Sequence, residues 1–286
     1  MKSIRTIATA TGLLMLGTFG CAATHPLGPG FVHRTFPIDG GTLACAHRPA
    51  PGPALMLIPG TFSDSQVYAE TVPVLDRRFN LILIENRGLG ASWPPPVNGS
   101  IEQCAADALY IADALDVDRF FIGGHSLGGM ISIEVGRIAT ERVLGIISIE
   151  GWTSWRAARD AFGFDMSSTL SQEQLDAKAA YRKRVLARWS REEVAAFGKI
   201  WRKWDGYAFL EQTELPILEL WGDRGKAPRP SLARLLVPER SNIEVMWFKD
   251  ASHSLLIERP SGIAEAINRF VARVAAGSRI SGVNIS

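Results

Sequence analysis

The chain has 286 residues, of which 47% are hydrophobic and 21% are charged, as expected for a globular protein that builds a sizeable core in one large domain or two small ones. Its formal net charge is +2 and it has no dense basic run, which argues against nucleic acid as a partner. Outside the N-terminus, no apolar stretch is long enough to span a bilayer, so we expect no transmembrane segment.

Residues 1–23 have the pattern of a secretory signal. Lys2 and Arg5 precede an apolar run that ends at Phe19, and small residues suitable for cleavage follow. We therefore expect export to the periplasm or the medium. Cys21 leaves a second possibility open, in which the protein is a bacterial lipoprotein anchored through a lipid on that cysteine, although the residues before it match that signal poorly.

Cys45 and Cys104 remain once the signal is removed. An even pair in an oxidising compartment is able to form a disulfide. However, Cys45 falls in a predicted strand and Cys104 in a predicted helix, and we favour two buried free thiols.

Residues 30–151 alternate between apolar strand patterns and helical patterns. The expected elements are a strand pair over 31–48, a strand over 54–58, a helix over 67–75, a strand over 81–84, a helix over 100–115, a strand that ends before Ser126, a helix over 129–140 and a strand over 143–149. The alternation resumes in 213–277, with strands over 216–221 and 243–248 and a terminal amphipathic helix. Such alternation predicts an α/β fold with a mostly parallel, doubly wound sheet.

Residues 152–212 interrupt the alternation. They contain no strand pattern, are helix-like and tryptophan-rich, and carry many arginines and lysines. We interpret them as a helical cap inserted into a core formed by 30–151 and 213–277. We expect most of its tryptophans to pack against the core and its basic residues to form a solvated face.

Ser126 lies at a sharp corner between a predicted strand and a predicted helix. The five residues from Gly124 to Gly128 spell G-x-S-x-G, a pattern that places a serine hydroxyl above the end of a sheet. The flanking glycines are needed because a Cβ would crowd the facing turn. The following helix directs its N-terminal N–H groups toward an oxyanion. We predict that Ser126 is a nucleophile.

A serine hydroxyl needs a base to accept its proton, and histidine has a suitable pKa near neutral pH. Ligands bind at the carboxyl ends of the strands of an open parallel sheet. His253 follows the last predicted strand and is the only histidine after Ser126 in the sequence. We predict that His253 is the base.

Four motifs together resemble the α/β-hydrolase family whose members carry a helical cap. They are Pro59-Gly60-Thr61, Asn86-Arg87-Gly88-Leu89-Gly90-Ala91-Ser92, Gly124-His125-Ser126-Leu127-Gly128-Gly129, and Ser252-His253-Ser254-Leu255 with Glu258 and Pro260. The resemblance covers about residues 31–277. It implies an oxyanion hole made by the backbone N–H groups of Thr61 and Leu127, with His125 as a structural neighbour. Haloalkane dehalogenases have a similar layout but use an aspartate nucleophile followed by tryptophan, which Ser126-Leu127 does not match.

The acid that should orient His253 is where the chain departs from the family pattern. Family members commonly have Gly-x-x-Asp after the strand that follows the cap, but here Gly222-Asp223-Arg224-Gly225 has glycine at the acid position. Some relatives instead place a glutamate after the strand that precedes the cap, where this chain has Glu150. We favour Glu150 over Asp223.

These residues predict an exported serine hydrolase that cleaves small carboxylic esters or lactones through an acyl-enzyme and needs no cofactor or metal. The rival reading is a non-catalytic ligand-binding or receptor protein on the same fold. Amide hydrolysis, C–C bond hydrolysis and perhydrolysis use the same residues and stay open. The sequence does not indicate the oligomeric state.

Overall fold

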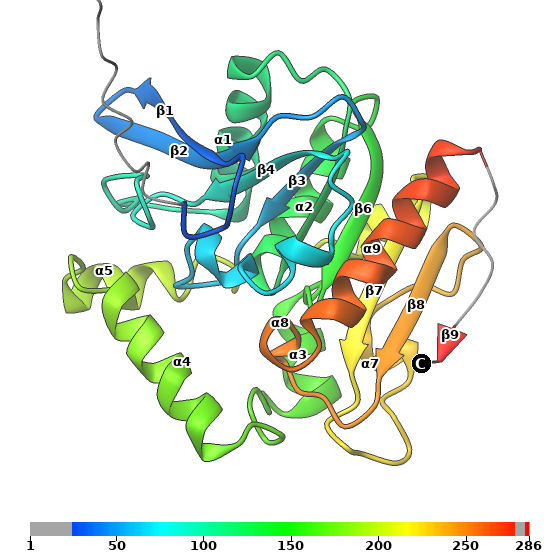
Figure 1. The fold of residues 1–286 in the computed structure, drawn as a ribbon. Coiled ribbons are helices and arrows are strands. Elements are labelled where there is room, and N and C mark those ends of the chain that lie inside the picture. The colour runs from blue at the N-terminus through cyan, green and yellow to red at the C-terminus, as the bar shows by residue number, and fades with distance from the viewer. Residues whose placement is uncertain (1–24, 278–283, 286) are drawn as a thin grey trace, which may run out of the picture.

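A computed structural model describes residues 25–277 and 284–285. The predicted signal over residues 1–23, including Cys21, lies outside the described residues, and export stays a prediction. Within the described part, one sheet with strand order β1-β2-β4-β3-β5-β6-β7-β8-β9 runs through the molecule (Figure 1).

Strand β2 is antiparallel to both of its neighbours, and the sheet is parallel from β4 to β9. The central strands are apolar on both faces because helices cover both sides of the sheet. The strands are β1 (Val32–Ile38), β2 (Gly41–Arg48), β3 (Ala54–Ile58), β4 (Asn80–Glu85), β5 (Phe120–His125), β6 (Val143–Ile149), β7 (Ile217–Gly222), β8 (Ile243–Phe248) and β9 (Asn284–Ile285).

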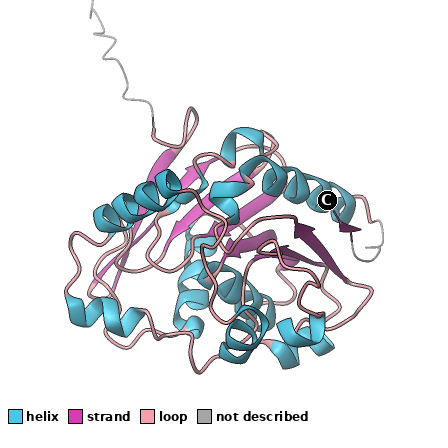
Figure 2. Cartoon of the chain, turned by 90° about the horizontal axis from the view of Figure 1, so that it is seen from below, coloured by secondary structure: helices cyan, strands magenta, loops and turns pink. Residues whose placement is uncertain are grey.

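Helices α1 and α2 pack on one face of the sheet, whereas η1, η2 and α9 pack on the other (Figures 1 and 2). This arrangement confirms the predicted doubly wound α/β fold. The helices are η1 (Ser65–Tyr68), η2 (Val72–Val74), α1 (Ile101–Ala114), α2 (Leu127–Ile138), α3 (Trp155–Phe162), α4 (Gln172–Val185), α5 (Arg191–Phe197), α6 (Tyr207–Gln212), α7 (Leu232–Leu235), α8 (Leu255–Glu258) and α9 (Pro260–Ala275).

The prediction of one helix over 67–75 is wrong. The structure has two short 3-10 helices there, η1 and η2. Pro73 lies in the first turn of η2 and has no N–H to continue an α-helical ladder, so the chain breaks into two turns.

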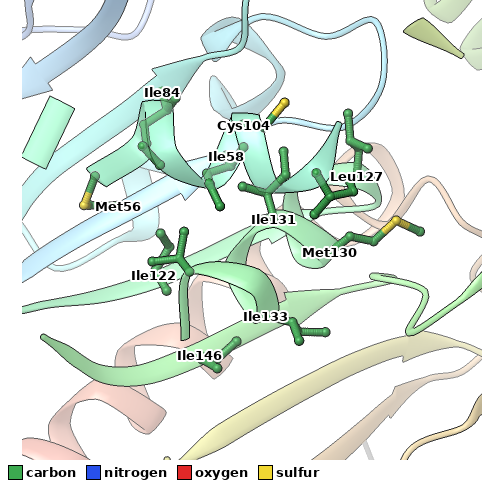
Figure 3. Close-up of a cluster of buried hydrophobic side chains, with 14 of the residues drawn as sticks. Met56, Ile58, Ile84, Cys104, Ile122, Leu127, Met130, Ile131, Ile133 and Ile146 are labelled. Carbon is green, nitrogen blue, oxygen red and sulfur yellow. The ribbon is translucent and has the colours of Figure 1, made fainter. Parts of the chain in front are cut away.

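The core beneath α1 and α2 is filled by aliphatic side chains from the sheet and from α2 (Figure 3). Cys104 extends from α1 into this core, and Cys45 is buried in β2. Both are free thiols, as predicted. Burial raises the pKa of each to about 12, so neither forms a reactive thiolate near neutral pH.

Helices α3 to α6 occupy the segment between β6 and β7, where the sequence predicted a helical cap. Figure 1 shows α3, α4 and α5 on the side of the sheet at which β7 and β8 end. The capping box predicted at Ser190 and Glu193 begins α5. Whether 152–212 forms a separate domain stays a prediction. Among the described residues, no helix combines the length and apolarity needed to cross a bilayer.

Glu219 is a fully buried carboxyl in β7. Burial raises the pKa of Glu219 to about 8, against smaller lowering effects from the side chains of Ser148 and Trp221. The group is therefore neutral in the folded protein but ionised in the unfolded chain at neutral pH. The contribution of Glu219 to the free energy of unfolding is complete below the pKa that the group has in the unfolded chain. As pH rises from there toward the pKa in the folded protein, this contribution is lost by about 1.4 kcal/mol per pH unit.

We expect Glu219→Gln to flatten this pH dependence. The free energy of unfolding of the variant should improve relative to the natural protein as pH rises from about 5 to about 8, because glutamine has no proton to lose. Denaturant unfolding at a series of pH values measures the difference. Two parallel stability curves would contradict an uncharged Glu219 in the fold.

Candidate active site

Ser126 forms the corner between β5 and α2. Its backbone has φ 55° and ψ −115°, a strained conformation for a residue with a side chain, and its N–H donates to the Ile149 carbonyl at 2.8 Å. A Cβ at Gly128 would lie 2.0 Å from the Ile58 carbonyl oxygen, so only glycine lets α2 start this close to β3. The corner therefore has the geometry that the G-x-S-x-G pattern predicts.

The structure brings Ser126, His253 and Glu150 together from three strand ends. His253 Nε2 lies 2.9 Å from Ser126 Oγ. On the other side of the ring, His253 Nδ1 lies 3.0 Å from Glu150 Oε2. The predicted hydrogen bond between the far ring nitrogen of His253 and Glu150, which accepts it, is therefore present. A hydroxyl, an imidazole and a carboxylate in this order form the arrangement of a serine-hydrolase triad.

Arg224 holds the Glu150 carboxylate in place and was not found by sequence reasoning. Its two terminal nitrogens donate to the two oxygens of Glu150, each at 2.6 Å, and the Gly222 N–H also donates to Oε1 at 2.6 Å. Both side chains are fully buried. Arg224 is the second residue after β7, in a turn where an arginine usually faces solvent, so the sequence contained no signal for this contact.

Arg224 and Glu150 set the charge state of the site. Burial alone would raise the pKa of Glu150, but Arg224 and His253 hold it below its usual value, so the carboxylate is charged. Burial lowers the pKa of His253 from 6.5; Glu150 opposes the shift, while Arg224 and Lys178 add to it. His253 is therefore neutral near pH 7 and able to accept a proton.

Asp223, the alternative acid, does not contact His253. Its Oδ1 accepts the backbone N–H groups of Gly225 and Asp250, each at 2.8 Å, and Oδ2 lies 3.5 Å from Arg229 Nε. Asp223 therefore stabilises the turn after β7. The structure thus leaves Glu150, and not the alternative acid Asp223, beside His253.

Thr61 and Leu127, the residues predicted to form the oxyanion hole, line one cavity with Ser126. In the described part of the chain, neither backbone N–H donates a hydrogen bond. A Cβ at Gly60 would lie 2.9 Å from His125 Nδ1, which shows how closely the Thr61 turn approaches the corner. Both N–H groups are thus available to a bound oxygen.

His125 has a structural contact, as the resemblance implied. Its Nε2 donates to the His253 carbonyl oxygen at 2.7 Å. Burial, with smaller contributions from neighbouring charges, lowers the pKa of His125 to about 3, so the ring stays neutral. His125 fixes the backbone of the loop that carries His253.

The cavity above Ser126 has a volume of about 710 Å³ and lies between the sheet edge and the helices of 152–212. Trp152 stacks on the His253 ring, with centroids 5.6 Å apart, and lines the cavity together with Trp201. Trp155 instead packs against Trp201. The described residues contain no cluster of three histidine, cysteine or acidic side chains suited to a metal ion.

The expectation that the basic residues of 152–212 form a solvated face is wrong for Lys178, which is half-buried, whereas Arg182 is exposed as expected. Lys178 and Arg182, both on α4, line the cavity. They follow one another at a spacing of four residues, which places both on one face of the helix. The local sequence of Lys178 resembles that of the exposed basic residues around it, so only the packing of α4 reveals the difference.

Sequence comparison relates the chain to hydrolases. The model of the alpha/beta hydrolase fold matches residues 53–187. RutD of Pseudomonas syringae pv. syringae, named as a carbamate hydrolase, is 30% identical over 112 residues, which are 39% of this chain and 42% of that protein. RutD of Escherichia coli O127:H6 is 26% identical over 104 residues. The chain thus matches less than half the length of these curated relatives.

Solved structures match over far more of the chain. A hydrolase from Pseudomonas aeruginosa superposes with a TM-score of 0.69 at 23% identity, covering 85% of this chain and 98% of the other. The enol-lactonase of Burkholderia xenovorans superposes with a TM-score of 0.66 at 20% identity, covering 84% of this chain and 100% of the other. Est816, described as an N-acyl homoserine lactone degrading enzyme, superposes with a TM-score of 0.67 at 22% identity, covering 83% of this chain and 100% of the other. With the matched model of the alpha/beta hydrolase fold, these superpositions show that the chain has the α/β-hydrolase fold.

Proposed function

We propose that the protein is a serine hydrolase that cleaves small carboxylic esters or lactones. The observation that carries the proposal is the hydrogen-bonded chain from Ser126 through His253 to Glu150 at the wall of the cavity. Two similar solved structures are described as lactone-degrading enzymes, which supports this substrate class. The same chain of hydrogen bonds argues against the non-catalytic rival.

In the proposed reaction, Ser126 Oγ attacks the carbonyl carbon while His253 Nε2 accepts the hydroxyl proton. Glu150 accepts the Nδ1–H of the ring and stabilises the imidazolium. The N–H groups of Thr61 and Leu127 donate to the oxyanion. His253 then gives its proton to the leaving alcohol oxygen, and the acyl group remains on Ser126. Water, activated by His253, cleaves that acyl-enzyme and restores the free serine.

A fluorophosphonate probe tests the proposal on the intact protein. We expect stoichiometric labelling of the peptide that contains Ser126, together with turnover of aryl esters in a chain-length series or of lactones. Aryl carbamates and amides belong in the same panel because of the similarity to RutD. If the protein turned over only carbamates or amides, the proposed ester or lactone substrate would be replaced by that class. Absence of both labelling and turnover would favour a ligand-binding protein.

Export is part of the proposal because of Lys2, Arg5 and the apolar run that follows them. Intact mass of the protein from its native host should show that the N-terminus is removed close to residues 21–24. A mass increase on Cys21 that corresponds to a diacylglycerol group would select the lipoprotein version. A full-length product in the cytoplasm would overturn export in both versions.

A further inference from the structure

We propose that Lys178 makes the cavity selective for substrates that carry a carboxylate, so that the preferred ester or lactone is an anion. This inference rests on the proposed hydrolysis at Ser126 and adds the charge of the substrate. It arises from a half-buried ammonium group that the reaction itself does not use.

The ammonium group lies beside the loop that carries the base. Lys178 Nζ donates to Ser254 Oγ at 2.8 Å and to Ser167 Oγ at 3.1 Å. Ser254 directly follows His253, and both line the cavity with Lys178. An ammonium has three donors, and no acceptor for the third is found among the described residues. A ligand oxygen in the cavity is able to take that position.

Lys178 has no ion-pair partner close by, because no carboxylate of the described residues lies within 4.0 Å of Nζ. Glu258 acts on Lys178 from a greater distance, and its oxygens accept hydrogen bonds from Ser252 and Thr169. Burial lowers the pKa of Lys178, as expected for a cation that loses water without gaining an ion-pair partner. A bound carboxylate would supply that partner.

A second cation, the exposed Arg182, also lines the cavity. Arg182 lies one turn along α4, with its guanidinium 4.6 Å from the centroid of the Phe62 ring. Like charges four residues apart repel on a helix, so this pair opposes helix stability rather than supporting it. By contrast, Arg184 is paired with Asp64 at 3.0 Å. Among the described residues that line the cavity, Glu70 is the only carboxylate, and it is exposed.

The other residues that line the cavity restrict the chemical class of the substrate. Phe62, Leu127, Met130 and Trp201 give the cavity apolar walls. A substrate that places its carbonyl at Ser126 would lay a short apolar chain along these walls and extend its carboxylate to Lys178. This chemistry corresponds to a monoester of a dicarboxylic acid or to a lactone that bears a carboxylate.

Two matched aryl esters test the inference, one with a terminal carboxylate on its acyl chain and one with a methyl group in its place. The natural protein should have the higher kcat/KM for the anionic ester. Lys178→Met should lower the ratio of kcat/KM for the anionic ester to kcat/KM for the neutral ester by about 10- to 100-fold, the effect of losing a charge-assisted hydrogen bond. Lys183→Met, on the same helix but exposed and away from the cavity, is the matched control and should preserve the preference.

Lys178→Gln gives a second measure, because glutamine still donates to hydroxyl oxygens but has no charge. Binding of the anionic ester to Ser126→Ala, measured by calorimetry, should weaken when Lys178→Gln is added. A preference for the neutral ester, or equal losses on both esters in the Lys178 variants, would overturn the inference and leave hydrolysis at Ser126 standing. Failure of the proposed function would appear differently, as no labelling of Ser126 and no turnover of either ester.

Discussion

Ser126→Ala is expected to abolish turnover and covalent labelling while the protein keeps its fold. The substitution deletes one oxygen, the one that lies 2.9 Å from His253 Nε2. In serine proteases, loss of the nucleophile lowers turnover by about a million-fold. Stability should change little, because the corner is held by the backbone hydrogen bond to Ile149 and by the close approach of Gly128. Ester turnover, probe labelling and thermal unfolding measure the three effects.

Ser132→Ala is the matched control for this experiment. Ser132 lies on α2 and its buried hydroxyl donates to the Gly128 carbonyl at 2.7 Å, so its loss should cost about 1 kcal/mol of stability. Labelling and turnover should remain. Stoichiometric labelling of Ser126→Ala at the cavity would show that another residue is the nucleophile.

The second large effect is expected at Glu150. Glu150→Gln should lower turnover by about four orders of magnitude, because an amide no longer holds the His253 ring in the tautomer that exposes a free Nε2 and no longer stabilises the imidazolium. Asp223→Asn is the matched control. Asparagine still offers an oxygen to the N–H groups of Gly225 and Asp250, so most activity should remain. The reverse ranking of the two variants would overturn the role of Glu150.

Arg224 complicates the reading of Glu150→Gln, because a neutral amide leaves a buried guanidinium unpaired. Breaking a buried ion pair from one side costs about 3–5 kcal/mol, enough to unfold a marginal protein. Glu150→Asp resolves the ambiguity. It keeps the charge beside Arg224 but shortens the reach to His253 Nδ1, so the folded variant should still lose more activity than Asp223→Asn. Equal activity of Glu150→Asp and Asp223→Asn would count against the proposed triad.

Local patterns in the sequence predicted the frame of the site well. Apolar runs marked the buried strands, and glycines at 124 and 128 marked a corner that no other residue fits. Parallel strands end at one edge of a sheet, so residues just after those ends gather there whatever their separation in the chain. Ser126 and His253 were found from such patterns, and the resemblance to relatives pointed to Glu150, although the three residues lie up to 127 residues apart. Pro73 shows the limit of periodicity, since it ended a helix that the apolar pattern predicted.

The amino-acid pattern is therefore enough to predict the sheet and the corner at Ser126, because both follow from short-range periodicity and from the rules of parallel strands. The directions of the charged side chains in turns and exposed helices depend instead on tertiary packing. Arg224 reaches back to Glu150 across 74 residues, and Lys178 faces the cavity while Lys183 faces away. Such orientations depend on how distant elements pack, and the local sequence around a basic residue is the same whether water or a buried carboxylate surrounds it.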